Sequence, residues 1–399
     1  MTRVPAASRP LSSRLPLFVL AIVLSAAMLR APLVAVAPVA RMIGVDLGVS
    51  AAVVGLLTSI PVLAFAVCAP IAITVIRRGG PDLALTVTLA GAIVGCLVRS
   101  AGGLPAALVG TAIIGLFLTI GNVVVPVIIA REFPAHRVHM MTGVYTSAIN
   151  VGTMTVTVAT APVAAGIGWR GAIALWAVFG VAALAAWISL LGVRRAFAPR
   201  PVARRGAEER HPSVVRAGST WALGAAFAGQ AFSFYAMTAW LPTLLIDRGF
   251  GLEAAGAIAG IFQVAGVAGA LLLPVLTTRS SILAGVIAVA LGWLTIPVGF
   301  LLAPDLWWLW CLAGGVAQGG GITVVFIMIS ALGGDERSVT GRSGLVQGIG
   351  YALAAVGPTA IGALHEATGA WTAPLLVVLG AVLVFGVVGG ALAARLRAA

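Results

Sequence analysis

Long apolar stretches constrain this chain more than any other feature of its sequence. Twelve segments of about 20 residues are long enough to cross the hydrocarbon core of a bilayer as helices. They lie near residues 15–41, 51–76, 82–99, 104–130, 139–166, 169–193, 218–246, 252–276, 282–302, 306–331, 339–364 and 371–394. Only 9% of the residues are charged, whereas a soluble domain carries about 25%. We therefore predict an all-α membrane protein with twelve transmembrane helices.

The arginines predict how the spans are oriented. All 24 basic residues are arginines, and 19 of them lie before the first span, after the last, or in loops that follow even-numbered spans. Loops rich in arginine remain in the cytoplasm, so both termini and the central loop are expected inside. The net charge of +13 then reflects topology. The expected partners are the lipid bilayer and a small-molecule substrate, and nucleic acid is not one of them.

A polar stretch divides the chain into two similar halves. We expect an N-terminal six-helix bundle at 1–193, a cytoplasmic arginine-rich linker at 194–217 and a C-terminal six-helix bundle at 218–399. The fifth and eleventh spans both begin Thr-Gly, reach a proline about 20 residues later and end near a tryptophan. Such internal repeats are typical of secondary transporters, which bind their substrate near the bilayer midplane between the halves.

Arg30 is the candidate substrate-binding residue. It lies about 4 Å past the middle of the first span at 1.5 Å per residue, where a charge costs about 2.5–3.5 kcal/mol on insertion scales. Pro32 cannot donate a backbone hydrogen bond, so it frees a carbonyl near Met28. A broken helix at this depth is tolerated where it faces protein or a water-filled cavity. Either Arg30 binds an anionic or strongly polar substrate there, or it is structural.

None of the eleven acidic residues lies in the middle of a span. Arg30 therefore has no carboxylate partner in the sequence pattern, which favours a substrate as its counter-ion. The usual intramembrane proton carrier, an Asp or Glu, is also missing. Proton coupling would have to use a group at the rim or a proton carried by the substrate.

Uncharged polar and aromatic side chains in the spans are the remaining candidates for a substrate site. They either converge on one cavity or hydrogen-bond helix to helix. They are Asn122, Asn150, Gln230, Tyr235, Trp240, Gln263, Gln318, Gln347 and Tyr351.

Two cytoplasmic loops carry a candidate charge latch. Arg77 and Arg78 precede Asp82 in one loop, and Arg131 precedes Glu132 in the other. Pairing between these loops would hold one conformation of a transporter. The alternative is that the arginines only mark the cytoplasmic side.

Signatures of enzymes and of metal or cofactor sites are absent from the sequence. There is no nucleophile elbow, HExxH motif or Walker loop. Cys68, Cys96 and Cys311 lie in apolar runs without CxxC spacing, which is typical of buried structural cysteines. We expect no enzyme activity, no metal, no cofactor and a monomeric state.

Seven segments in order along the chain resemble the cyanate and nitroimidazole transporter family of the major facilitator superfamily. They are "LRAPLVAVAPV", "GLLTSIPVLAF", "IGNVVVPVI", "MTGVYTSAINVG", "GWRGAIALW", "FYAMTAWLPTLLIDRG" and "VQGIGYALAAVGPTAIGALHEATGAW". The resemblance implies two six-helix bundles that alternate access to a central site in the cytoplasmic membrane of a bacterium. It implies small substrates, either anions or nitrogen heterocycles, and a binding role for Arg30.

The resemblance has one departure. The superfamily usually places an acid ahead of the basic pair in the loop between spans two and three, whereas here that position is Thr74 and the acid comes later, at Asp82. The latch of that loop is therefore an open question. Two hypotheses for the substrate follow: a small anion or weak acid bound by Arg30, or a neutral lipophilic drug held by Tyr235, Trp240 and Phe262, with Arg30 structural.

Overall fold

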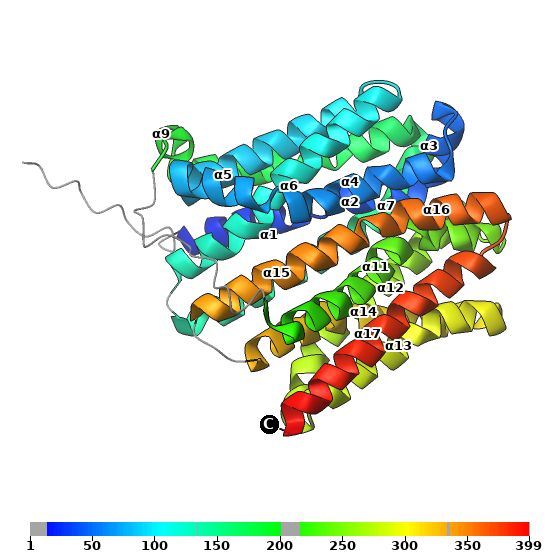
Figure 1. Ribbon diagram of the computed structural model, residues 1–399. Coiled ribbons are helices and arrows are strands. Elements are labelled where there is room, and N and C mark those ends of the chain that lie inside the picture. The colour runs from blue at the N-terminus through cyan, green and yellow to red at the C-terminus, as the bar shows by residue number, and fades with distance from the viewer. Residues whose placement is uncertain (1–13, 134, 201–215, 333–335, 399) are drawn as a thin grey trace, which may run out of the picture.

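The computed structural model of the chain describes residues 14–133, 135–200, 216–332 and 336–398, and these residues form helices without strands. The prediction of an all-α chain is confirmed. In Figure 1 the helices from the two ends of the sequence lie side by side as two long groups, one blue to green and the other green to red. The part of the predicted linker at 201–215 lies outside the described residues, and the predicted domain boundaries remain predictions.

The first half of the chain contains ten helical elements in its described residues, and it begins with a broken helix. The elements are α1 (Leu15–Met28), α2 (Ala31–Val34), η2 (Ala37–Val39), α3 (Ala40–Leu47), α4 (Ala51–Val67), α5 (Ala69–Ser100), α6 (Leu104–Glu132), α7 (Ala135–Leu175), α8 (Ala177–Leu191) and α9 (Val193–Phe197). The second half of the chain begins after residues 201–215. Its elements are α11 (Gly218–Asp247), α12 (Leu252–Arg279), α13 (Ile282–Leu302), η3 (Pro304–Leu306), α14 (Trp307–Ala331), α15 (Glu336–Ala354), α16 (Val356–Thr368) and α17 (Thr372–Ala398).

Two glycines divide helices that are too long for one span. Gly80 in α5 has φ 81° and Gly168 in α7 has φ 74°, a left-handed region that glycine enters without steric cost. Both lie where the sequence predicts a loop between consecutive spans. With these breaks, every predicted span lies on one or more of the described helices.

The outward faces of the helices are as apolar as their packed faces. Within the described residues, nine helices have the length and composition to cross a membrane. Large apolar side chains remain exposed on them, including Leu271 at 66% and Val387 at 68%. A chain with apolar residues on both its interior and its perimeter is stable with lipid around it.

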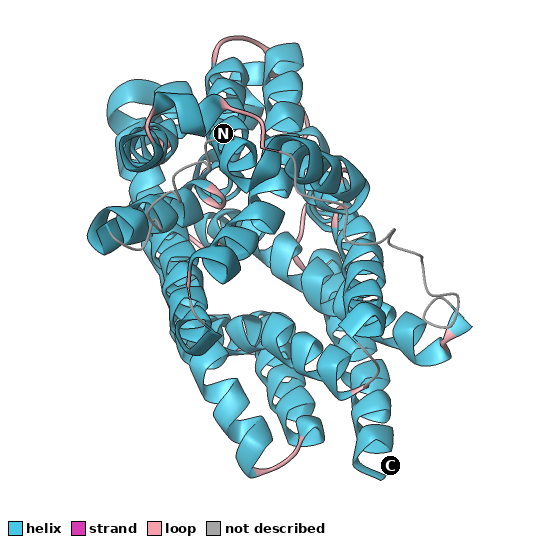
Figure 2. Cartoon of the chain, turned by 90° about the vertical axis from the view of Figure 1, so that its left-hand side faces the viewer, coloured by secondary structure: helices cyan, strands magenta, loops and turns pink. Residues whose placement is uncertain are grey.

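The two groups of helices contact each other through small residues. α4 packs against α15 and α16, and α7 packs against α12. A Cβ atom at Gly55 would lie 2.6 Å from the Pro358 carbonyl oxygen, and one at Gly260 would lie 2.3 Å from a methyl of Val158. Both contacts lie towards the end of the molecule that carries α3 and the end of α16, which we call the outer end. Figure 2 looks along the helices from the opposite, inner end.

Candidate functional site

The first span is broken at Arg30. Helix α1 ends at Met28, α2 begins at Ala31, and Arg30 is the N-cap residue of α2 with φ −119° and ψ −32°. Pro32 stands in the first turn of α2, a position where its missing N–H is not needed. The predicted break after Met28 is therefore present, and Arg30 occupies the junction itself.

Arg99 supports the broken segment from the neighbouring helix α5. Its side chain is fully buried, and Nη1 donates a hydrogen bond of 2.6 Å to the carbonyl oxygen of Pro32. Carbonyls at a helix break need donors from outside the helix, and Arg99 provides one two residues after Arg30. Nothing in the sequence pattern had marked Arg99 as a partner of this segment.

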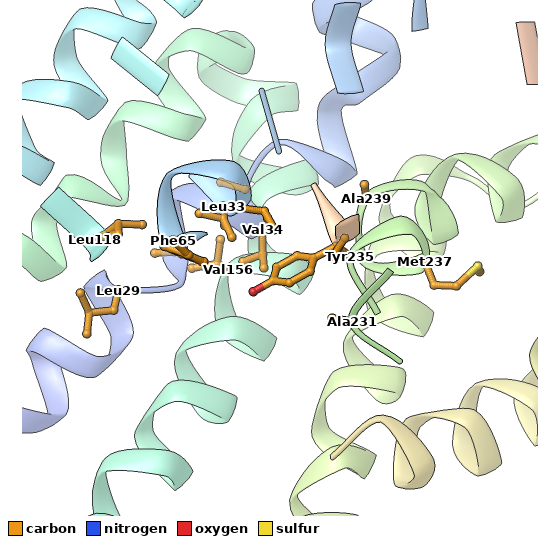
Figure 3. Close-up of a cluster of buried hydrophobic side chains, with 14 of the residues drawn as sticks. Leu29, Leu33, Val34, Phe65, Leu118, Val156, Ala231, Tyr235, Met237 and Ala239 are labelled. Carbon is orange, nitrogen blue, oxygen red and sulfur yellow. The ribbon is translucent and has the colours of Figure 1, made fainter. Parts of the chain in front are cut away.

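All three tyrosines of the chain lie within electrostatic range of Arg30. Tyr145, Tyr235 and Tyr351 are the ionisable groups that interact with its guanidinium electrostatically. They come from α7, α11 and α15, so one belongs to the first half of the chain and two to the second. In Figure 3 the Tyr235 ring reaches from its helix towards side chains of the first half. Tyr235 and Tyr351 were predicted as site residues. Tyr145 was not, although the scarcity of tyrosine was a usable signal.

Aromatic rings complete the surroundings of Arg30. Its guanidinium carbon lies 5.8 Å from the ring centroid of Phe65, within the range of a cation–π interaction. Phe65 and Tyr351 meet edge to face at 5.6 Å, and Tyr235 and Tyr351 at 6.4 Å. The site thus joins one cation, three phenol hydroxyls and flat apolar surfaces.

Arg30 has no carboxylate partner among the described residues. It is half-buried, its Nη1 is buried without a hydrogen-bond acceptor, and none of the ion pairs in the described chain includes it. A buried guanidinium nitrogen without an acceptor is costly. Arg30 is thus a partly exposed cation without an anionic partner in the described residues.

Three of the four glutamines of the second half contact neighbouring helices. Gln263 donates to the Thr238 hydroxyl at 3.3 Å, and Gln318 approaches the Gln263 carbonyl oxygen at 3.5 Å. Gln230 packs against Gly321, where a Cβ would lie 2.3 Å from its amide nitrogen. All three glutamines are buried. Gln263 and Gln318 therefore bond helix to helix in this conformation, and the role of all three in substrate binding stays a prediction.

The remaining predicted side chains lie in different places. Asn122 on α6 and Asn150 on α7 are half-buried. Gln347 donates to the Ser343 hydroxyl within α15 at 2.9 Å. Trp240 donates from Nε1 to the Pro358 carbonyl oxygen at 2.6 Å, which ties α11 to α16. The role of each in substrate binding stays a prediction.

The predicted latch residues form two groups. Asp82, two residues after the Gly80 break in α5, accepts hydrogen bonds from Arg131 Nη2 at 2.5 Å and Arg195 Nε at 3.0 Å. Arg131 also donates to Glu132 at 2.8 Å. These side chains line a cavity of about 450 Å³. Asp82 therefore pairs with two arginines. The pairing with Arg195 was not predicted from the sequence.

Arg77 and Arg78 are exposed on α5 and form no ion pair within the described part of the chain. Their predicted pairing with the acids of the loops is not present in this conformation.

A second charged cluster closes the outer end between the two halves. Asp247, at the end of α11, accepts from Arg41 Nη2 at 3.1 Å and Trp371 Nε1 at 3.0 Å, and lies 3.2 Å from His365 Nε2. Nearby, the Ala51 amide donates to Glu366 at 3.0 Å. We call Arg41, Asp247, His365 and Trp371 the outer cluster. Together with the pairing of Ser59 and Thr359 hydroxyls at 2.9 Å, it joins the halves opposite the inner end.

No group of three or more His, Cys, Asp or Glu in the described ranges could hold a metal ion. Apolar spans in two packed groups, with a helix break and a lone cation between them, define a membrane transporter.

The comparison with known families gives the same class. Residues 18–355 match the Major Facilitator Superfamily, and the chain belongs to that superfamily. The predicted fold class is thereby confirmed, and members of this family are transporters rather than enzymes.

Three relatives align over most of their length and most of this chain. The uncharacterized transporter YycB of Bacillus subtilis strain 168 is 31% identical over 90% of this chain and 89% of that protein. The 2-nitroimidazole transporter of Escherichia coli K12 is 30% identical over 89% and 90%. The cyanate transport protein CynX of the same organism is 25% identical over 88% and 90%. The predicted resemblance is confirmed.

Solved structures share the fold at lower identity. A D-xylose-proton symporter superimposes with a TM-score of 0.73, at 13% identity, over 96% of this chain and 97% of the other. At that identity the likeness concerns the fold alone.

Proposed function

We propose that the chain is a secondary active transporter that carries a small anion or weak acid, or a small nitrogen heterocycle, across the cytoplasmic membrane by alternating access. Arg30 is the counter-charge of the substrate in a central site. The relatives named for 2-nitroimidazole and cyanate support small substrates of these two kinds. The protein acts as a monomer, with both termini and the linker at 194–217 in the cytoplasm.

One observation is the main support for an anionic substrate. Arg30 is a cation at a helix break, its Nη1 has no acceptor, and three hydroxyl-bearing side chains surround it. A bound anion would accept from the guanidinium and from the phenols together, and charge-assisted hydrogen bonds are roughly twice as strong as neutral ones.

The alternative is an efflux pump for neutral lipophilic compounds, with Arg30 structural. That hypothesis requires Tyr235, Trp240 and Phe262 to form one pocket. Phe262 is fully buried and packs edge to face on Trp293 at 6.0 Å, and Trp240 is bonded to Pro358. Both side chains therefore have packing roles, which disfavours a shared drug pocket.

The test is a thermal-shift screen of purified wild type, Arg30→Ala and Arg30→Lys. The ligands are cyanate, nitrite, formate and neutral 2-nitroimidazole. A ligand that binds the folded state stabilises it by RT ln(1 + [L]/Kd). We expect an anion to raise the melting temperature of wild type, to act weakly on Arg30→Lys and to leave Arg30→Ala unchanged. Stabilisation by 2-nitroimidazole alone, equal in all three proteins, would support the alternative.

A further inference from the structure

The charge on Arg30 affects whether the carrier can change from one open side to the other without a bound substrate. In the observed conformation the outer end is closed by the outer cluster, while Arg30 keeps part of its surface exposed. Exposure to water partly compensates a guanidinium that lacks an anionic partner. To change sides, an alternating-access carrier must pass through a state in which the site is closed at both ends, and Arg30 then loses that water.

No acidic side chain in the described part of the chain lies near enough to Arg30 to neutralise its charge. Its electrostatic neighbours are Tyr145, Tyr235 and Tyr351, which are neutral donors, and Phe65 offers only a ring face at 5.8 Å. The described acids that form ion pairs do so near the ends of the molecule, with Arg41, Arg131, Arg170, Arg195 and His365. Closing the empty site would therefore bury an unpaired charge, which is strongly unfavourable.

The second buried guanidinium supplies no negative charge to the site. Arg99 is fully buried, its Nε and Nη2 have no hydrogen-bond partner, and its one bond goes to the backbone of the broken segment. Arg99 therefore cannot serve as a partner that neutralises Arg30. A bound anion that enters with Arg30 neutralises its charge, and it can accept from Tyr145 of one half and from Tyr235 and Tyr351 of the other.

We infer that the chain is an anion exchanger: it changes sides only when an anion occupies Arg30, so export of one anion is tied to import of another. The inference rests on the proposed anion site and goes beyond it, because a site for an anion is equally compatible with a carrier that returns empty.

The test measures how fast the empty carrier changes between its two open states. A donor and an acceptor fluorophore are placed at Val45→Cys and Leu302→Cys, both 80% exposed and one in each half, after Cys68, Cys96 and Cys311 are replaced by alanine. Energy transfer between them is recorded on single molecules in nanodiscs, in a buffer whose only anion is the bulky MES. We expect empty wild type to change only rarely between a short and a longer, outer-open distance. Arg30→Met is expected to change between them at least about tenfold more often, because no unpaired charge is buried on the way.

Two variants calibrate the labels. Asp247→Asn removes the hub of the outer cluster and should give the outer-open distance without any change at Arg30. Asp46→Asn removes an ion pair with Arg170 inside the first half and should leave the short distance unchanged. If Arg30→Met does not fold, the same measurement is made on Arg30→Gln, which also lacks the charge.

The inference is overturned if empty wild type changes between the two distances as often as Arg30→Met and Arg30→Gln do. Failure of the proposed function would appear elsewhere, as a thermal-shift screen in which no anion depends on Arg30.

Discussion

At the scale of single residues, the site combines one cation with three phenols. If the hydroxyls donate to the substrate, each of Tyr145→Phe, Tyr235→Phe and Tyr351→Phe removes one hydrogen bond worth about 0.5–1.5 kcal/mol. We expect the Kd of the stabilising anion to rise about two- to tenfold in each variant, as measured by thermal shift across a concentration series.

Trp240→Phe is the matched control for the tyrosine variants. It removes the bond to the Pro358 carbonyl and should lower the melting temperature without changing the Kd. If Trp240→Phe weakens anion binding as much as the tyrosine variants do, the hydroxyls have no special role and Trp240 lies in the site as first predicted.

Asp82 is the acid on which the inner charges of the first half depend. Its side chain is 6% exposed and pairs with Arg131 at 35% and Arg195 at 18%. Asp82→Asn keeps the shape and leaves two arginines without their carboxylate, and we expect a loss of about 1–2 kcal/mol in the free energy of unfolding. Thermal unfolding in detergent measures it. Arg77→Gln, at an exposed and unpaired position, should change little. Equal losses in both variants would mean that the cluster adds no specific stability.

At the scale of elements, the break between α1 and α2 positions Arg30. Pro32→Ala supplies an N–H that can donate to the Met28 carbonyl, so the helix can continue through the break. We expect the melting temperature to stay or rise while the Kd of the anion increases at least about tenfold, because Arg30 turns with the helix. A variant that melts higher and binds equally well would show that the break does not position the arginine.

The sequence predicts the elements better than it predicts their contacts. Apolar length and arginine placement locate the spans, because each depends on local composition. Pro32 next to Arg30 predicts the broken helix for the same reason. The contacts of Gln263 and Gln318 could not be predicted, since an amide in a span looks the same whether it lines a cavity or bonds a neighbouring helix.

At the scale of the whole molecule, the outer cluster could not be predicted from the sequence. Arg41 and Asp247 are 206 positions apart, and Asp247 and Trp371 are 124 apart. Each lies at the rim of a span, where a charge is unremarkable. Only the packing of the two halves brings these side chains together. Arg99 was missed for a similar reason, because its partner is a backbone carbonyl in another span.

The central claim is that Arg30 is the counter-charge of a transported anion. The most direct measurement is uptake of radiolabelled cyanate into proteoliposomes preloaded with unlabelled cyanate, for wild type and Arg30→Ala, with labelled 2-nitroimidazole in parallel. We predict transient accumulation of cyanate by wild type and none by Arg30→Ala. Equal accumulation of cyanate by both proteins, or transport of 2-nitroimidazole alone and undiminished by Arg30→Ala, would contradict the claim.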